Sequence, residues 1–256
     1  MLACLMALAV GWQGAAMADG WDDLLPKVPV PTAIPASTPD SAPASSPVGF
    51  SSRLVLRGWD GASYQYVQLG NYVSGGRKPE PILWRVLYTT DNRALLLSEY
   101  ILATRPFDSS RSIWDGSRIK EWLNGTFLRN AFSAKEDYDA LVDDWELGRV
   151  FLLSREEMAN ESYGFSRKES SPDSQRQARG TSNAIFEGLW GADTGYSSYF
   201  TRTAKGRTSV YQIRSDGCFG EARINRDNVG TRPAIWIFLD KVSFSSGDGT
   251  MESPYR

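Results

Sequence analysis

The sequence predicts an α+β fold, in which an antiparallel sheet is combined with helices in the first half of the folded region. Three observations predict it. Strand-like apolar runs stand near 64–69, 82–88 and 93–98. Apolar residues with helical spacing follow at 117–132, and a series of strand-like runs separated by turn residues fills 198–239. The first half therefore mixes strands and helices, and the second half consists of strands.

The first 18 residues have the pattern of an export signal. Leu2 to Val10 form an apolar core, and Ala16-Met17-Ala18 is a small-x-small cleavage site. We therefore expect an exported protein, whether periplasmic, at the cell surface or secreted. We expect no membrane span in the mature chain, because this core is too short to cross a bilayer. A lipoprotein attachment at Cys4 and an apolar helix packed on the domain are the alternatives.

Residues 19–50 predict a disordered linker. Proline recurs there every few residues among Ala, Ser and Thr, a composition that buries too little apolar surface to offset chain entropy. A single domain is expected over 51–245, followed by an exposed tail of turn residues at 246–256. Because Cys4 lies within the signal, Cys218 is the one cysteine of the mature chain, and no intramolecular disulfide is expected.

The first elements of the domain are predicted to be strands. Residues 64–69 alternate and end at Gly70, as a half-buried strand does. Residues 82–88 form the next strand, and Asp91-Asn92 turns it into a third, at 93–98. The last two strands are expected to form a hairpin.

The predicted helical region begins at Ser117. Ile119, Trp122 and Leu123 lie at positions i, i+3 and i+4, which predicts an amphipathic helix that ends at Gly125. A similar stripe continues over 127–132.

A capping box, Ser154-Arg155-Glu156-Glu157, follows the apolar strand 150–153. The segment 160–183 is polar, and loops of this length in compact domains are usually functional or disordered.

The second half predicts four strands in one antiparallel sheet. Asp216-Gly217 is a hairpin turn between the runs at 209–214 and 219–224. The final strand, 229–239, contains Pro233 directly before a continuous apolar stretch. Proline cannot donate to a strand ladder, so Pro233 is expected at the first residue of a strand or at a sheet edge. The apolar residues after it predict a strand buried on both faces.

Composition excludes several classes of function. The chain has no histidine, which rules out a Ser-His-Asp triad, a Cys-His pair and a histidine zinc site. A net charge of -2 offers no basic surface for nucleic acid. The carboxylates at Asp143, Asp144 and Glu146 follow a helix and are typical of solvated charges. We therefore predict no catalytic residue, no metal site and no cofactor.

Several short motifs, in the order in which they occur along the chain, resemble those of a known family. They are Trp84-Arg85-Val86-Leu87, Trp122-Leu123-Asn124, Val150 to Ser154, Arg202, Asp216-Gly217 and Gly230-Thr231-Arg232-Pro233-Ala234. The chain resembles a family of bacterial exported domains of unknown function that end in a G-V-R-P-A motif. The later half of that family looks like the C-type lectin fold, which formylglycine-generating enzymes share.

The resemblance implies structural roles for the residues of these motifs: Trp84, Trp122, Arg202, Asp216, Gly217, Arg232 and Pro233. Both arginines are interpreted as partly buried donors that hold loop carbonyls or a carboxylate. A formylglycine-type oxidase requires a cysteine pair for copper, which the mature chain with Cys218 alone does not supply.

Two functions remain. The first is a non-enzymatic exported binding module for a carbohydrate or a cell-surface protein. Its binding face is expected on the long loop from about Asn160 to Tyr199, with Trp190, Tyr196 and Tyr199 as exposed ligand-binding aromatics. The second is a structural or assembly domain of a cell-envelope complex. An enzyme of the formylglycine-generating type is the less favoured third alternative.

Overall fold

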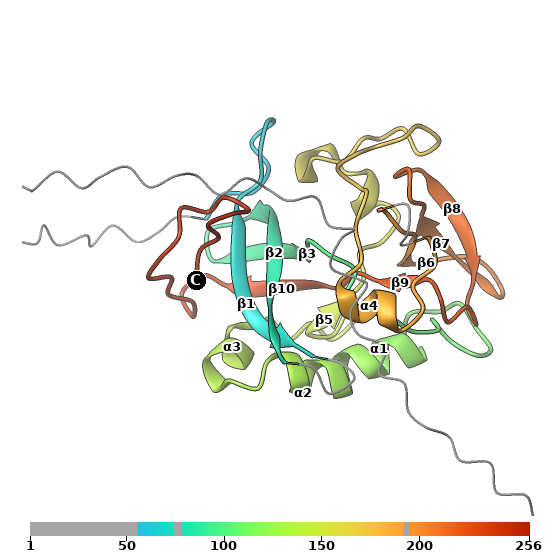
Figure 1. Cartoon of the computed structure of the whole chain (residues 1–256), viewed down its shortest axis with the longest axis horizontal. Helices are drawn as coiled ribbons and strands as arrows, with labels where there is room; N and C mark the ends of the chain where they lie inside the picture. The colour runs from blue at the N-terminus through green and yellow to red at the C-terminus, as the bar shows by residue number, and fades with distance from the viewer. Residues whose placement is uncertain (1–55, 74–77, 192–194) are drawn as a thin grey trace, which may run out of the picture. The chain divides into compact units, whose positions relative to one another are not determined.

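The computed structural model describes residues 56–73, 78–191 and 195–256 (Figure 1). The predicted signal at 1–18 and the predicted linker at 19–50 lie outside the described residues. No helix in the described ranges is long and apolar enough to cross a membrane.

The first sheet has five strands in the order β1-β2-β3-β10-β5, and every neighbouring pair is antiparallel. Its strands are β1 (Tyr66–Tyr72), β2 (Glu80–Thr89), β3 (Arg93–Ser98), β5 (Val150–Phe151) and β10 (Ala234–Phe238). The hairpin predicted at Asp91-Asn92 is present, since β2 and β3 pair directly across it. β10 comes from the far end of the chain and lies against β3 in register, with Ala234 opposite Leu97.

The second sheet has five strands in the order β4-β9-β6-β7-β8. Its strands are β4 (Ala103–Thr104), β6 (Tyr199–Gly206), β7 (Ser209–Ile213), β8 (Phe219–Arg223) and β9 (Gly230–Thr231). All pairs are antiparallel except β6 with β9, which is parallel. Two mostly antiparallel sheets with a few helices make the fold α+β, as predicted.

The closing run 229–239 differs from the single strand that we expected. It is divided into β9, in the second sheet, and β10, in the first, with Arg232 and Pro233 between them. Pro233 has no amide hydrogen to donate, so the ladder is interrupted where the chain passes from one sheet to the other. The four late strands therefore do not form one sheet. Within β10, Ile235 and Ile237 belong to one core cluster, while Ala234 and Trp236 belong to the other or pack against it.

The helices lie mainly in the first half of the domain. They are α1 (Arg118–Trp122), the π-helical turn η1 (Leu123–Phe127), α2 (Leu128–Ala131), α3 (Lys135–Ala140), the 3-10 turns η2 (Glu157–Ala159) and η3 (Glu161–Tyr163), and α4 (Ser182–Phe186). Ser117 caps α1 by accepting a hydrogen bond from the amide of Lys120 (3.3 Å). The predicted stop at Gly125 is wrong. The helix continues through it, because Leu123 and Phe127 on either side are buried in the core.

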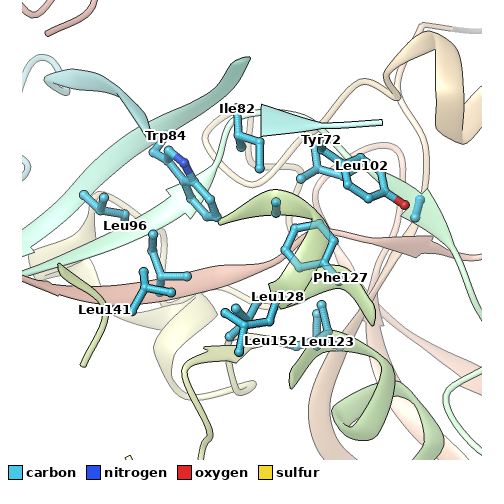
Figure 2. Packing of buried hydrophobic residues seen from close by; sticks show 14 of the residues in the cluster. Tyr72, Ile82, Trp84, Leu96, Leu102, Leu123, Phe127, Leu128, Leu141 and Leu152 are labelled. Carbon is cyan, nitrogen blue, oxygen red and sulfur yellow. The ribbon is translucent and has the colours of Figure 1, made fainter. Parts of the chain in front are cut away.

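The larger core cluster lies between the first sheet and helices α1 and α2 and extends to Phe200, Val210 and Ala222 of the second sheet. Figure 2 shows Trp84 and Leu96 of the sheet facing the same interior as Phe127 and Leu128 of the helices. Trp84 has no exposed surface, and its indole N–H donates to the carbonyl of Leu69 (2.8 Å), so its polar atom is also satisfied. A smaller cluster on the other face of the sheet includes Leu95, Leu97, Phe165 and Tyr199, the last of which belongs to β6 of the second sheet.

The predicted exposed tail, 246–256, is exposed only in part. The amide of Tyr255 donates to the carbonyl of Tyr66 (3.0 Å), and its carbonyl accepts from the amide of Gln68 (2.8 Å), so the chain end extends the edge of β1. Pro254 is buried, and the Tyr255 ring packs beside Phe244. The apolar side chains near the end offset the polar turn composition on which the expectation of exposure depended.

Asp108 supplies a pH-dependent contribution to stability. Its carboxylate accepts hydrogen bonds from the amides of Ser110 (2.8 Å), Arg111 (3.2 Å) and Arg118 (3.1 Å). Burial opposes ionisation, but these backbone hydrogen bonds outweigh it and lower the pKa of Asp108 from 3.8 to about 2. Because the folded-state pKa lies below the unfolded-state value, the stabilisation is present above about pH 4 and is lost as the pH falls towards about 2.

Asp108→Asn is therefore expected to lower the free energy of unfolding by about 1 kcal/mol near neutral pH. The difference from the wild type should shrink as the pH falls from about 4 to about 2. Urea unfolding of both proteins at several pH values measures it. Asp91→Asn, in the exposed turn between β2 and β3, is the matched control. A difference that stays constant down to low pH would contradict this account.

Candidate binding groove

A groove of about 480 Å³ lies over the edge of the second sheet. It is lined by Trp190, Ser198, Gln212, Glu221, Ala222, Arg223, Arg226, Asn228 and Val229. Its volume is in the range of small-molecule sites, roughly 300–1,000 Å³. Trp190 is its large aromatic side chain, and 71% of this residue is exposed.

The chain following α4 places Trp190 in this groove. Thr181 caps α4 by accepting from the amide of Ala184 (3.3 Å), and the chain leaves the helix through Gly188 with φ of 99°. That left-handed conformation favours glycine. Leu189 is then buried in the smaller core cluster, and Trp190 projects to the surface. The amide of Trp190 donates to the carbonyl of Asn228 (3.0 Å), which fixes the backbone of Trp190 to the loop that forms the opposite wall.

β8 supplies the charged wall of the groove. In strand geometry Glu221 and Arg223 lie on one face, while Ala222 between them is buried on the other. Glu221 is paired with Lys205 (3.2 Å), and hydrogen bonds from Ser209 and Lys205 hold the pKa of Glu221 below its usual value. Among the described residues, Arg223 and Arg226 have no carboxylate partner.

A second hollow of about 290 Å³ lies at the other end of α4. Tyr72, Tyr100 and Leu102 form part of its wall, with Thr181 and Asn183 at the start of the helix. The side-chain amide of Asn183 donates to the carbonyl of Leu102 (3.2 Å), and its buried oxygen has no hydrogen-bond partner in the part of the chain that the structure describes. The segment from Gly180 to Trp190 therefore borders both hollows, within the long loop region that was expected to carry the binding face.

One family model matches part of the chain. Residues 147–239 match the model of a family described as Domain of unknown function (DUF6273). The match covers less than half of the 256 residues. No curated protein and no solved structure matches the chain. The matched residues, 147–239, contain the groove, α4 and every predicted site residue except Trp84 and Trp122. It accords with the predicted resemblance to a domain of unknown function.

The three aromatic residues predicted to bind a ligand have different environments. Trp190 lies in the groove. Tyr196 is half-buried beneath Arg179, whose guanidinium lies 4.9 Å from the ring centroid, and it does not line the groove. Tyr199 is 2% exposed, so the expectation that it is a surface aromatic is wrong. Its hydroxyl donates to the carbonyl of Arg176 (2.5 Å), and burial raises its pKa.

Arg202 binds the capped turn that precedes the polar segment 160–183. Ser154 and Glu157 form the predicted capping box: the Ser154 amide donates to the Glu157 carboxylate (2.7 Å), and the Glu157 amide donates to the Ser154 hydroxyl (3.1 Å). Arg202 donates to that same carboxylate and to the carbonyl of Leu152 (2.8 Å). These contacts are those of a structural donor.

Asp216 and Gly217 form the turn between β7 and β8. Asp216 accepts from the amide of Cys218 (2.9 Å) and is paired with Arg214 (3.2 Å). Gly217 has φ of 81°, and an added Cβ would come within 2.0 Å of the carbonyl oxygen of Asp173, so the close approach requires glycine. Cys218 is a free thiol, buried in this turn.

Trp122, and the carboxylates Asp143 and Asp144 that were predicted to be solvated charges, contact neighbouring side chains or turn amides. Trp122 is half-buried against Phe127, and the guanidinium of Arg105 lies 5.2 Å from its ring centroid. Asp143 is paired with Arg149 (2.9 Å), and Asp144 accepts from two turn amides, those of Glu146 and Leu147 (2.9 Å each). Across 56–73, 78–191 and 195–256, no three Asp, Glu, Cys or His side chains are grouped closely enough to hold a metal ion.

Arg232 lies at the junction of the two sheets and is 1% exposed. Its Nε donates to the carbonyl of Ser98 (2.8 Å), and its Nη1 donates to the carbonyl of Arg176 (3.2 Å) and to the hydroxyl of Tyr199 (3.1 Å). The carbonyl of the adjoining Pro233 accepts from the amide of Ser98 (2.9 Å). The two motif residues therefore join the end of β3 to the polar segment 160–183, which contains Arg176.

Arg176 was missed by the sequence analysis. It is completely buried and donates to five backbone carbonyls, those of Gly217 (2.6 Å), Met158 (3.3 Å), Ser166 (2.7 Å), Lys168 (2.9 Å) and Ser171 (3.3 Å). Its one carboxylate contact is Asp173, at 3.4 Å. The polar segment 160–183 is therefore wound around a buried guanidinium. Apart from a polar composition shared with ordinary loops, the sequence contains no signal for this arrangement.

Proposed function

We propose that this protein is an exported, non-enzymatic carbohydrate-binding module with a C-type-lectin-like fold, and that the groove beside Trp190 holds the ligand. The observation that carries the proposal is an indole 71% exposed in a groove whose remaining lining is largely polar. An aromatic face stacks on the C–H face of a sugar ring, while amide, carboxylate and guanidinium groups bond to its hydroxyls. The hydrogen bond from the Trp190 amide to the Asn228 carbonyl holds the main chain at this point, so the indole is attached to an ordered backbone beside the polar wall of the groove.

Sequence features support the remaining parts of the proposal. The apolar run at 2–10 with its small-x-small site supports export to the periplasm, cell surface or medium. The order of the motifs that end at Gly230 to Ala234 supports a lectin-like fold of bacterial origin. The lack of histidine and the structural contacts of Asp143 and Asp144 favour binding over catalysis.

Trp190→Ala is expected to weaken glycan binding at least about fivefold, because truncating a central aromatic residue typically costs more than about 1 kcal/mol of binding free energy. A glycan array identifies the bound sugar, and titration calorimetry on that sugar measures the loss. Trp145→Ala is the matched control, since Trp145 is 87% exposed and lies outside the groove. Equal affinity of the wild type and the Trp190 variant would exclude the groove.

The array is paired with a pull-down from cell-envelope extract. Retention of a protein that depends on Trp190, with no glycan bound, would replace the carbohydrate with a cell-surface protein. Absence of both ligands would reject the binding function. If, in addition, the chain formed stable oligomers that Trp190→Ala leaves intact, the structural or assembly function would be favoured instead.

A further inference from the structure

The side chains that line the groove carry a net positive charge, whereas the chain as a whole is slightly negative. The whole sequence carries a formal net charge of -2, yet the groove exposes two arginines and one glutamate. Glu221 is already paired with Lys205, so its charge is largely compensated before a ligand arrives. Arg223 and Arg226 are both exposed and have no carboxylate partner among the described residues. Two uncompensated cations thus lie in the groove that contains the exposed indole.

From this arrangement we infer that the ligand is an acidic glycan, a sugar that bears a carboxylate, sulfate or phosphate group. The inference rests on the proposed function and specifies its ligand class. A guanidinium forms paired, charge-assisted hydrogen bonds with each of these anions, and these bonds are stronger than bonds to neutral hydroxyls. A neutral glycan would leave both guanidinium groups without an anionic partner.

The positions of the two arginines suit one anion held beside a stacked ring. Arg223 is the last residue of β8, and Arg226 follows in the loop to β9, where its amide donates to the carbonyl of Arg223 (3.2 Å). Asn228, two residues further, provides the carbonyl that holds Trp190. Both cations and the aromatic residue are therefore linked through one short loop, so a sugar ring stacked on Trp190 has its substituents close to them.

The test uses the full chain and an array of matched glycan pairs: uronic-acid oligosaccharides with their methyl esters, sulfated with desulfated chains, and phosphorylated with dephosphorylated chains. We expect binding to the acidic member of a pair only, and the type of pair identifies the anion. Raising the salt concentration from about 0.05 to about 0.5 M should weaken this binding, because exposed charges are screened.

The double variant Arg223→Gln/Arg226→Gln should bind the acidic glycan about 10- to 100-fold more weakly. Arg207→Gln is the control, because Arg207 is exposed and lines a different hollow with Ser110 to Ile113. Equal binding of acidic and neutral members, with no effect of the double variant, would overturn the inference and leave the carbohydrate function standing. Absence of binding to every glycan would reject both. Circular dichroism of each variant tests whether the fold is retained.

Discussion

Arg176→Met is expected to lower the free energy of unfolding by about 4 kcal/mol, which we expect to be the largest effect of any single change proposed for this protein. Methionine fills much of the same volume but donates no hydrogen bond. Five backbone carbonyls that now bond to the guanidinium would lose that partner inside the domain. Urea unfolding followed by tryptophan fluorescence measures the loss, and limited proteolysis should show new cleavage within 160–175.

Arg167→Met is the matched control for Arg176. It lies in the same segment, its side chain is 78% exposed, and its ion pair is with Glu161. Such surface pairs contribute about 0–1 kcal/mol, so this variant should unfold nearly as the wild type does. If Arg176→Met does not fold, Arg176→Lys keeps the charge and part of the bonding and should give an intermediate loss. A loss below about 1 kcal/mol for the methionine variant would contradict the role assigned to Arg176.

Arg232→Met is expected to cost about 3 kcal/mol of unfolding free energy, because it removes the donor that joins the end of β3 to the loop region. Tyr199→Phe removes the hydroxyl that donates to the carbonyl of Arg176 and accepts from Arg232, and it should cost about 1 kcal/mol of unfolding free energy. Since the two side chains are bonded to each other, the double variant should lose less than the sum of the two. Urea unfolding of the four proteins measures this coupling, and strict additivity would show that the contacts are energetically independent.

Much of the fold could be predicted because its signals are local. The hairpin at Asp91-Asn92, the helix start at Ser117 and the capping box at Ser154 depend on residues within a few positions of one another. Pro233 is also a local signal: because it has no amide hydrogen, a strand is expected to begin beside it, and β10 begins at the next residue. The stop at Gly125 was wrong for the opposite reason, because buried neighbours outweighed its low helix propensity.

The groove could be predicted only in part. Trp190 is a large aromatic residue in a long loop, and that composition pointed to an exposed role. Nothing in the sequence distinguished it from Tyr199, another aromatic in the same stretch, which is buried. Arg223 and Arg226 belong to the site because the chain after α4 brings Trp190 against the loop that follows β8. That contact joins segments about forty residues apart and has no local signature.

The sequence by itself determined the fold class, several of the turns and the place of Pro233 at the start of a strand. The tertiary structure alone decided how that run is shared between two sheets and what its arginine binds. Arg232 donates to the carbonyl of a residue 134 positions away, and Arg176 donates to one 41 positions away. The physical reason is that their acceptors are backbone carbonyls, which every residue carries, so no residue type in the sequence marks the partner.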